Sequence, residues 1–308
     1  MSHSPDFDAG KTVGYTLFVV KHNFDNREPI EKCLYIGDRA WLGIFRCSAK
    51  HPLFYKPAHF AGHNMITFPR TAVELHMLGQ ETVVASPNMV AFYNHGQEYH
   101  RKKLSETGDW CEWFKFSPRL LAEVIQRYDP QAGEMELRPF RHSHILISAR
   151  TLLHQRRIVH HLLTAKQRDS LWLDEMLLHL LDGIIAESYQ YRQEKTPKRK
   201  TTQRSHQDLV VETQKLLIKQ LHTPVTLAQL AQQLHTSSFH LCRVFRQITG
   251  KTIHSYLEQL RLRTALEWLP EYQNNLSGLA LAVGYKNHSH FTQAFRDAFG
   301  VPPSQIEF

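Results

Sequence analysis

Apolar residues along the chain change their spacing near residue 117. Before that point, short runs such as MITFPRTAVELHMLG (65–79) and TVVASPNMVAFYNHG (82–96) are broken by Pro, Asn and Gly, and CEWFKF (111–116) is rich in aromatic residues. Such runs are typical of short strands separated by turns. Residues 11–116 are therefore predicted to be mostly β structure, arranged as a sandwich or small barrel.

From residue 117 onward the apolar spacing becomes helical. Ser117 is placed to cap a helix that has Pro118 at its first position, and the apolar stripe of this helix is formed by Leu121, Val124, Ile125 and Tyr128. Residues 143–163 and 169–192 are predicted to form two more amphipathic helices. The apolar face of the second one is expected either to belong to the core or to contact a second copy of the chain.

Residues 193–207, QEKTPKRKTTQRSHQ, contain five basic residues, one acidic residue, one Pro and no apolar residue. This composition predicts a flexible linker, which either only tethers two domains or also touches phosphates. After the linker the pattern predicts a helix over 208–221, and Thr226 with Gln229 forms a capping-box pattern. We therefore expect four parts: a domain at 11–128, a helical connector at 129–192, a linker at 193–207 and an all-helical domain at 208–308.

Two stretches of the all-helical part, 227–250 and 276–300, repeat one pattern. At an offset of 49 or 50 residues, apolar, Arg and Gly positions correspond: Leu227, Leu230, Ala231, Leu234, Leu241, Phe245, Arg246 and Gly250 match Leu276, Leu279, Ala280, Val283, Phe291, Phe295, Arg296 and Gly300. The extra residue falls between two predicted helices. Each copy is therefore predicted to be a short helix, a turn and a longer helix, as in helix-turn-helix units.

The longer helix of each copy has an apolar face and a polar face. A period of 100° per residue puts Leu241, Val244, Phe245 and Ile248 inside in the first copy, and Phe291, Ala294, Phe295 and Ala298 in the second. The outward positions are Phe239, Arg243 and Arg246 in the first, with Cys242 beside them, and Ser289, Gln293 and Arg296 in the second, with Thr292 beside them. Such side chains suit base edges and phosphates in a major groove, although a helical bundle with a solvated polar face would show a similar pattern.

A further helix over 252–269 is predicted between the copies. Its length of roughly 27 Å is close to the roughly 34 Å between successive major-groove faces of B-DNA. Leu257, Leu260 and Ala265 are expected to pack it against both copies.

The blocks RVFRQITG, QLRLRTA, LAVGY and FTQAFRDAFGVPP resemble the DNA-binding domain of the AraC/XylS family of transcription regulators over about 208–303. This resemblance implies that seven residues read bases: Phe239, Cys242, Arg243, His288, Ser289, Thr292 and Gln293. The helical period of 100° per residue adds Arg246 and Arg296, which are expected to contact phosphates. Gly278 and the ending PPSQIEF depart from the family pattern, so the second unit is expected to bind DNA more loosely. Members with a β domain in front resemble cupins that bind an effector, which implies the same for residues 11–128.

The composition limits the class of protein. The formal charge is +8, four Cys lie far apart without a CxxC pair, and no apolar run reaches the length of a membrane helix. We expect a cytoplasmic protein without disulfides.

In the β-rich part, Arg70, His76 and Tyr93 are side-chain types that bind small ligands. His59, His63, His95 and His100 lack the spacing of a metal-binding cupin, so no metal and no cofactor are predicted. Cys47 and Cys111 are interpreted as buried thiols, with oxidant sensing as the alternative.

The sequence thus predicts an α+β, multidomain fold: an N-terminal β-rich, cupin-like sandwich or barrel, a helical connector, and a C-terminal all-α domain with two helix-turn-helix units. The predicted function is effector-responsive regulation of transcription, without enzyme activity. The expected partners are double-stranded DNA, a small-molecule effector, a second copy of the chain and RNA polymerase. The alternatives are a metal-dependent cupin enzyme with a DNA-binding tail and a DNA-binding dimer that needs no effector. Activation and repression are not distinguished.

Overall fold

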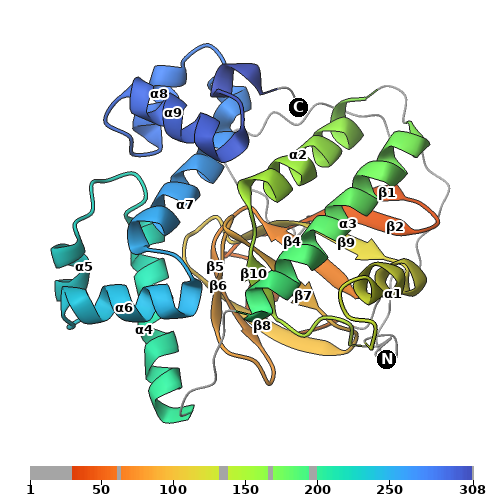
Figure 1. The fold of residues 1–308 in the computed structure, drawn as a ribbon, viewed down its shortest axis with the longest axis horizontal. Coiled ribbons are helices and arrows are strands. Elements are labelled where there is room, and N and C mark those ends of the chain that lie inside the picture. The colour runs from red at the N-terminus through yellow and green to blue at the C-terminus, as the bar shows by residue number, and fades with distance from the viewer. Residues whose placement is uncertain (1–29, 61–63, 132–137, 166–168, 194–199, 307–308) are drawn as a thin grey trace.

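The computed structural model describes residues 30–60, 64–131, 138–165, 169–193 and 200–306. An N-terminal domain of strands and helices lies beside a C-terminal domain made only of helices (Figure 1). The part of the predicted β region before residue 30 lies outside the described residues. None of the described helices is long and apolar enough to cross a membrane.

The strands of the N-terminal domain form two antiparallel sheets. They are β1 (Ile30–Ile36), β2 (Ala40–Cys47), β3 (Ala58–Phe60), β4 (Met65–Pro69), β5 (Val73–Met77), β6 (Val83–Ala85), β7 (Met89–Tyr93), β8 (Gln97–Lys103), β9 (Asp109–Phe116) and β10 (His144–Leu146). One sheet has the order β1-β2-β9-β4-β7-β10 and the other the order β3-β8-β5-β6. The predicted β-rich fold is confirmed.

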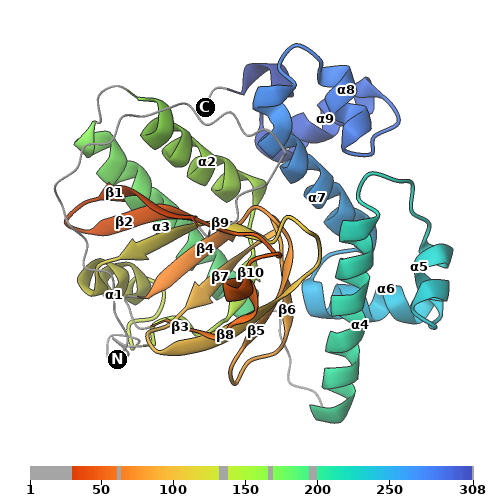
Figure 2. The ribbon, with the colours of Figure 1, turned by 180° about the vertical axis from the view of Figure 1, so that it is seen from behind.

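Successive side chains of a strand point to opposite faces of the sheet, so the apolar residues are divided between two cores. Met65, Met89 and Trp113 of the six-stranded sheet pack with Val73 and Leu75 of the four-stranded sheet. The opposite face of the larger sheet packs against three helices: α1 (Pro118–Gln126), α2 (Ala149–Thr164) and α3 (Ser170–Gln193). Figure 2 shows these helices beside the larger sheet.

The connector differs from its prediction at one place. Ser117 caps α1 as expected, since its side chain accepts a hydrogen bond from the Leu120 N–H. The helix predicted from residue 143, however, begins at Ala149 because His144–Leu146 pairs with β7 as an edge strand. Ser148 caps α2 instead. A three-residue strand is too short to produce a detectable alternation.

The C-terminal domain contains six helices among the described residues. These are α4 (Lys200–Lys219), α5 (Leu227–Gln233), α6 (Ser238–Thr249), α7 (Ile253–Trp268), α8 (Leu276–Ala282) and α9 (His288–Phe299). The start of α4 at Lys200 corrects the predicted linker, because residues 200–207 are helical rather than flexible. The remaining linker residues 194–199 lie outside the described part of the chain.

The two predicted helix-turn-helix units are α5–α6 and α8–α9, with α7 between them (Figure 1). Leu257 and Leu260 of α7 belong to the core of the first unit, whereas Ala265 belongs to the core that contains the second unit. That second core is continuous with the helix-covered face of the larger sheet. The helix α7 therefore joins both units, as predicted, and also the N-terminal domain, which the sequence did not predict.

The duplicated turns share one backbone requirement. His235 has φ 50° in the first turn, and Gly284, at an offset of 49, has φ 89° in the second. A Cβ on Gly284 would lie 2.8 Å from the Leu221 carbonyl oxygen and 3.0 Å from Arg261 Nε. Arg261 itself donates to that carbonyl at 2.9 Å. Glycine is therefore needed here both for its φ and for the close approach of the turn that follows α4.

We predict that Gly284→Ala destabilises the protein more than Gly300→Ala does. Both glycines have a left-handed conformation, which costs a residue with a Cβ roughly 1–2 kcal/mol. Nothing lies within 4 Å of a Cβ at Gly300, so that change should cost only this amount. Urea unfolding of the two variants measures the difference, and equal losses would contradict the close contact at Gly284.

Candidate nucleic-acid interface

The outward face of α6 carries the side chains predicted for the first unit. Leu241, Val244 and Phe245 are fully buried, whereas Phe239 is 79% exposed. Cys242, Arg243 and Arg246 are also exposed, and Ile248 is half-buried. The helix begins at a cap in which Ser237 Oγ accepts from the His240 N–H, and it ends at Gly250 in the left-handed conformation. The predicted division between inner and outer faces is therefore present in α6.

The outward face of α9 has the same layout. Phe291 and Phe295 are fully buried, while Gln293 and Arg296 are exposed. His288 and Ser289 are also exposed, Thr292 is half-buried, and the two predicted inner alanines, Ala294 and Ala298, are half-buried. Both helices thus present polar side chains on one side and anchor with aromatic or aliphatic side chains on the other.

Two neighbours of the predicted reading residues were missed in the sequence. The Gln293 amide Nε2 donates to Asp297 Oδ1 at 2.7 Å, and Arg243 Nη2 lies 3.4 Å from His240 Nδ1. The bond to Asp297 orients the Gln293 amide, while its carbonyl oxygen and second N–H stay available for an adenine edge. The spacings of four and three residues on a helix were the signals that could have identified these pairs.

The first helices of the two units are capped differently. In α5 Thr226 and Gln229 make the predicted capping box. At the corresponding place in α8, Asn275 Oδ1 accepts from the Gly278 N–H at 2.8 Å. A Cβ on Gly278 would approach the Asn275 side chain to 2.5 Å. The glycine that departs from the family pattern therefore makes room for its own cap.

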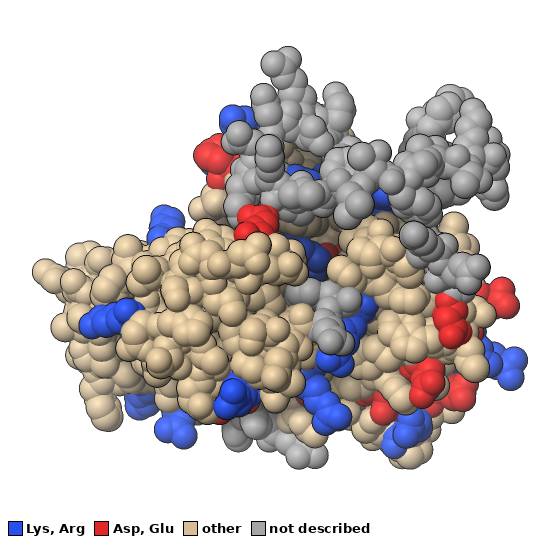
Figure 3. Space-filling model, turned by 90° about the horizontal axis from the view of Figure 1, so that it is seen from above, with Lys and Arg blue, Asp and Glu red and all other residues tan. Residues whose placement is uncertain are grey.

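The charge of the C-terminal domain is modest, because Lys and Arg outnumber Asp and Glu by only eleven to seven over 200–308. Most acidic side chains visible in Figure 3 lie toward the end of the molecule away from the helices of the C-terminal domain. On the outward faces of α6 and α9, Arg243, Arg246 and Arg296 contribute exposed positive charge, and Asp297 opposes it. Specific side chains, rather than a broad basic surface, therefore distinguish this interface.

The helix α7 is anchored to the N-terminal domain by polar contacts. The Asn88 amide donates to the Tyr256 carbonyl oxygen at 3.1 Å, and the Tyr256 hydroxyl lies 3.4 Å from Ser86 Oγ. Arg263, which is 1% exposed, donates to the carbonyl oxygens of Pro87, at 2.7 Å, and Ile147. Burial lowers the pKa of Arg263 to about 10, so it stays charged at neutral pH.

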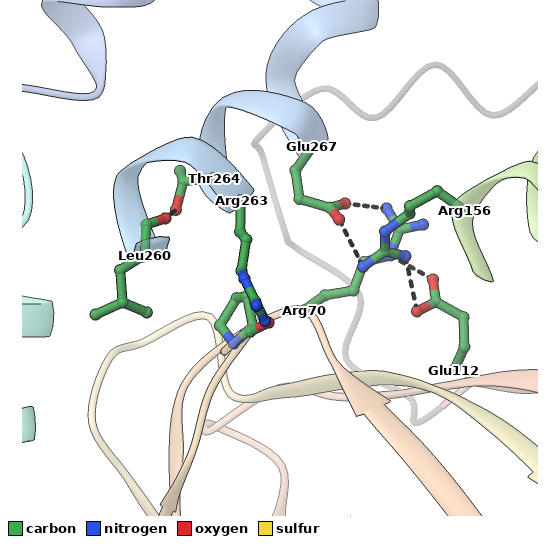
Figure 4. A network of polar contacts seen from close by, with 8 residues as sticks. Arg70, Glu112, Arg156, Leu260, Arg263, Thr264 and Glu267 are labelled. Carbon is green, nitrogen blue, oxygen red and sulfur yellow. Dashed lines mark hydrogen bonds and ion pairs between the residues drawn. The ribbon is translucent and has the colours of Figure 1, made fainter. Parts of the chain in front are cut away.

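Arg70, a predicted effector-binding residue, belongs to an ion-pair network. Its Nε donates to Glu112, and its Nη1 lies 2.5 Å from Glu267 Oε2 of α7. Arg156 bridges the same two carboxylates, at 2.9 Å from Glu112 and 2.5 Å from Glu267 (Figure 4). Burial opposes the ionisation of Glu112, but the charges and hydrogen bonds of Arg156 and Arg70 lower its pKa below the ordinary value.

The other two predicted effector residues have different surroundings. His76 Nε2 lies 2.6 Å from Glu74 Oε1, and its ring stacks on His100 at 4.6 Å. Tyr93 is buried in the core between the sheets, with its ring 4.9 Å from that of Tyr99. Arg70, His76 and Tyr93 thus contact three separate sets of neighbours.

The histidines considered as metal ligands and the two cysteines interpreted as buried thiols have defined surroundings in the described residues. No group of three or more His, Cys, Asp or Glu side chains within those residues could hold a metal ion. Residue His63 lies outside them, whereas His95 and His100 are exposed. Burial raises the pKa of Cys111 well above its ordinary value and also raises that of Cys47. A raised pKa makes a thiol less reactive, in line with the interpretation as buried thiols.

The C-terminal residues are similar to known regulators. Residues 230–307 match the family model described as a helix-turn-helix domain. The HTH-type transcriptional activator RhaR of Pectobacterium carotovorum is 31% identical over 136 residues, which is 44% of this chain and 45% of that protein. The bifunctional transcriptional activator/DNA repair enzyme AdaA of Bacillus subtilis is 29% identical over 99 residues, 32% of this chain and 46% of that protein. The chain therefore spans less than half the length of these relatives.

The chain is also similar to parts of solved structures. The C-terminal domain of AraT, a response regulator from Geobacillus stearothermophilus, is 28% identical and covers 32% of this chain and 81% of its own, with a TM-score of 0.31. ToxT K231A from Vibrio cholerae is 10% identical and covers 86% of this chain and 96% of its own, with a TM-score of 0.36. Together with the sequence matches, the helix-turn-helix family model confirms the resemblance stated for the C-terminal residues.

Truncation of the two aromatic residues Phe239 and Phe291 should affect stability to very different extents. Phe239→Ala is expected to change the free energy of unfolding by less than about 0.5 kcal/mol, because the side chain is 79% exposed. Phe291→Ala should cost about 3–5 kcal/mol, because its side chain is fully buried. Chemical denaturation measures both values, and a large loss for Phe239→Ala would show that this side chain is part of the core.

The stabilising effect of Glu112 should depend on pH. Because its pKa is lower in the folded protein, the ionised carboxylate stabilises the fold above the ordinary pKa, and this contribution is lost as pH falls through the folded value. At neutral pH Glu112→Gln is expected to cost about 3–5 kcal/mol, as removal of one buried partner does. Unfolding experiments between about pH 7 and pH 3 should show the difference from the wild type shrinking with acid. The exposed Glu123→Gln serves as control, and a difference independent of pH would contradict the assignment.

Proposed function

We propose that this protein, whose C-terminal domain is an AraC-type helix-turn-helix domain, is a sequence-specific regulator of transcription. The observation that carries the proposal is the duplication of one surface: α6 and α9 each expose hydrogen-bonding and cationic side chains opposite a buried apolar face. The helix α7, with 16 residues, separates the units by about 24 Å of helix. This separation suits two successive major-groove segments on one side of a duplex.

Individual side chains have distinct proposed roles on DNA. Arg243 is suited to the O6 and N7 atoms of a guanine, and Gln293, oriented by Asp297, to an adenine. Arg246 and Arg296 are suited to phosphates, which position the protein without reading sequence. The exposed Phe239 is suited to a thymine methyl group. The remaining proposed base-reading residues are Cys242, His288, Ser289 and Thr292.

The N-terminal domain is proposed to make DNA binding responsive to a small-molecule effector in the cytoplasm, in a homodimer that also contacts RNA polymerase. Support for the dimer comes from α3, where Leu171 and Leu178 are seven residues apart and 76% and 36% exposed. A thermal-shift screen against small metabolites tests the effector, because a ligand that binds the folded protein raises its melting temperature. Analytical ultracentrifugation of Leu171→Ser tests the dimer.

Selection of bound sequences from random DNA tests the regulatory function. Two conserved segments about one helical turn apart are expected within each selected site. Enrichment of no sequence would refute specific recognition. Metal analysis of the purified protein tests the alternative of a metal-dependent enzyme, for which a stoichiometric metal is required.

Two arginine variants should separate base reading from phosphate binding. Arg243→Ala is expected to remove about 1–3 kcal/mol of discrimination at one base pair, whereas Arg246→Ala should weaken binding evenly on all sequences and lower the salt dependence. Fluorescence anisotropy with single-base variants of the selected site, at two salt concentrations, measures both effects. An even loss for Arg243→Ala would assign it to a phosphate instead.

A further inference from the structure

The face of α7 that is turned toward the N-terminal domain ends in a carboxylate. Tyr256, Leu260, Arg263 and Glu267 follow one another at intervals of four, three and four residues, and therefore lie on one side of the helix. The three polar members of this row all bond to residues of the N-terminal domain. Figure 4 shows Arg263 and Glu267 extending from α7 toward the β domain.

The Glu267 carboxylate contacts two arginines of the N-terminal domain, as a separate carboxylate ligand would. One of its oxygens lies 2.5 Å from Arg70 and the other 2.5 Å from Arg156. The Arg70 guanidinium also lies over the Trp110 ring, at 4.8 Å from the ring centre. Two guanidinium groups from the N-terminal domain thus contact one carboxylate from the C-terminal domain, and the Trp110 ring packs against one of these guanidinium groups. Paired guanidinium groups are well suited to binding a planar carboxylate.

The charges of this site balance only while α7 is docked. Arg70 and Arg156 carry two positive charges, and Glu112 and Glu267 carry two negative charges. Withdrawal of Glu267 would leave one positive charge uncompensated. This charge would be buried, because the side chain of Arg156 is 4% exposed and that of Glu112 is fully buried. An unpaired buried charge is strongly unfavourable, so the site requires an anion whenever Glu267 leaves it.

The order of exposure shows which carboxylate can be exchanged. Glu112 lies innermost, whereas the side chains of Glu267 and Arg70 are 11% and 16% exposed. Arg156 Nε, moreover, has no hydrogen-bond partner within the described residues. Solvent therefore reaches the site from the side of Glu267, and one buried donor is still unused.

We propose that Arg70 and Arg156 form a carboxylate-binding site of the N-terminal domain, that Glu267 fills it as an internal ligand, and that a small molecule carrying a carboxylate competes for it. This competition separates α7 from the N-terminal domain. Because α7 supports both helix-turn-helix units, the separation affects both of them. Docked and undocked states are those with α7 on and off the N-terminal domain. A ligand can shift the equilibrium between them only by as much as its affinities for the two states differ. The meaning for transcription rests on the proposed function, but the site itself does not.

The test uses Glu267→Ala, which removes the internal ligand, and acetate as the probe that replaces it. Without acetate, small-angle X-ray scattering is expected to show a larger radius of gyration than for the wild type. Acetate at about ten times its Kd should raise the ratio of folded to unfolded Glu267→Ala about 11-fold by mass action, and sodium chloride at equal ionic strength should not. Glu258→Ala, the same change on α7 outside the network, should match the wild type in both measurements.

An unchanged radius of gyration for Glu267→Ala, or equal effects of acetate and chloride, would overturn the proposal. If Glu267→Ala does not fold, Glu267→Gln keeps the side-chain volume without the charge, and the same increase in radius of gyration is expected. A compact Glu267→Gln would then overturn it. No measurement here uses DNA, so failure of this site is distinguishable from failure to recognise DNA.

Discussion

The burial of α7 on several sides is the constraint from which the arrangement of the whole chain follows. Its first half lies in the core of the first helix-turn-helix unit and its second half in the core shared by the second unit and the N-terminal domain. Tyr256 and Arg263, which are fully or almost fully buried, also make hydrogen bonds to the N-terminal domain. A helix with partners on several sides cannot move relative to one of them without exposing apolar or charged groups, so it couples the positions of all three.

Polar contacts give this docking its specificity. Apolar packing alone tolerates rotation and sliding, whereas the hydrogen bonds that Arg263 donates to two carbonyl oxygens and that Arg70 donates to Glu267 have definite directions. The ion pair between Arg156 and Glu267 adds to them. Buried ion pairs add little to stability, because the cost of removing charges from water offsets their attraction. Their effect here is to select one relative orientation of the domains, and an anion can alter that selection.

The two helix-turn-helix units show how one architecture is maintained by different local chemistry. The first uses a capping box and accepts His235 in a left-handed turn, while the second uses an asparagine cap over Gly278 and a glycine at the corresponding turn position. Gly284 is fixed by the neighbouring Leu221 carbonyl, a contact made between segments far apart in sequence. The outward faces have diverged as well, because Gln293 is paired with Asp297 and Arg243 with His240.

Much of the C-terminal domain was determined by the sequence, because its signals are local. Helical periodicity, the cap at Thr226 and the offset of 49 or 50 residues predicted the helices, the inner and outer faces of α6 and α9 and the extra residue in the second turn. The same reasoning treated residues 200–207 as a linker, since the residues that anchor this part of the chain in the core, Val210, Leu217 and Leu221, come later in the sequence. It also predicted Arg70 as an effector-binding residue without identifying its partner Glu267, whose carboxylate comes from 197 residues away in the chain. Only the tertiary structure decides such a pairing, because the energy of a buried charge depends on which distant group is brought beside it.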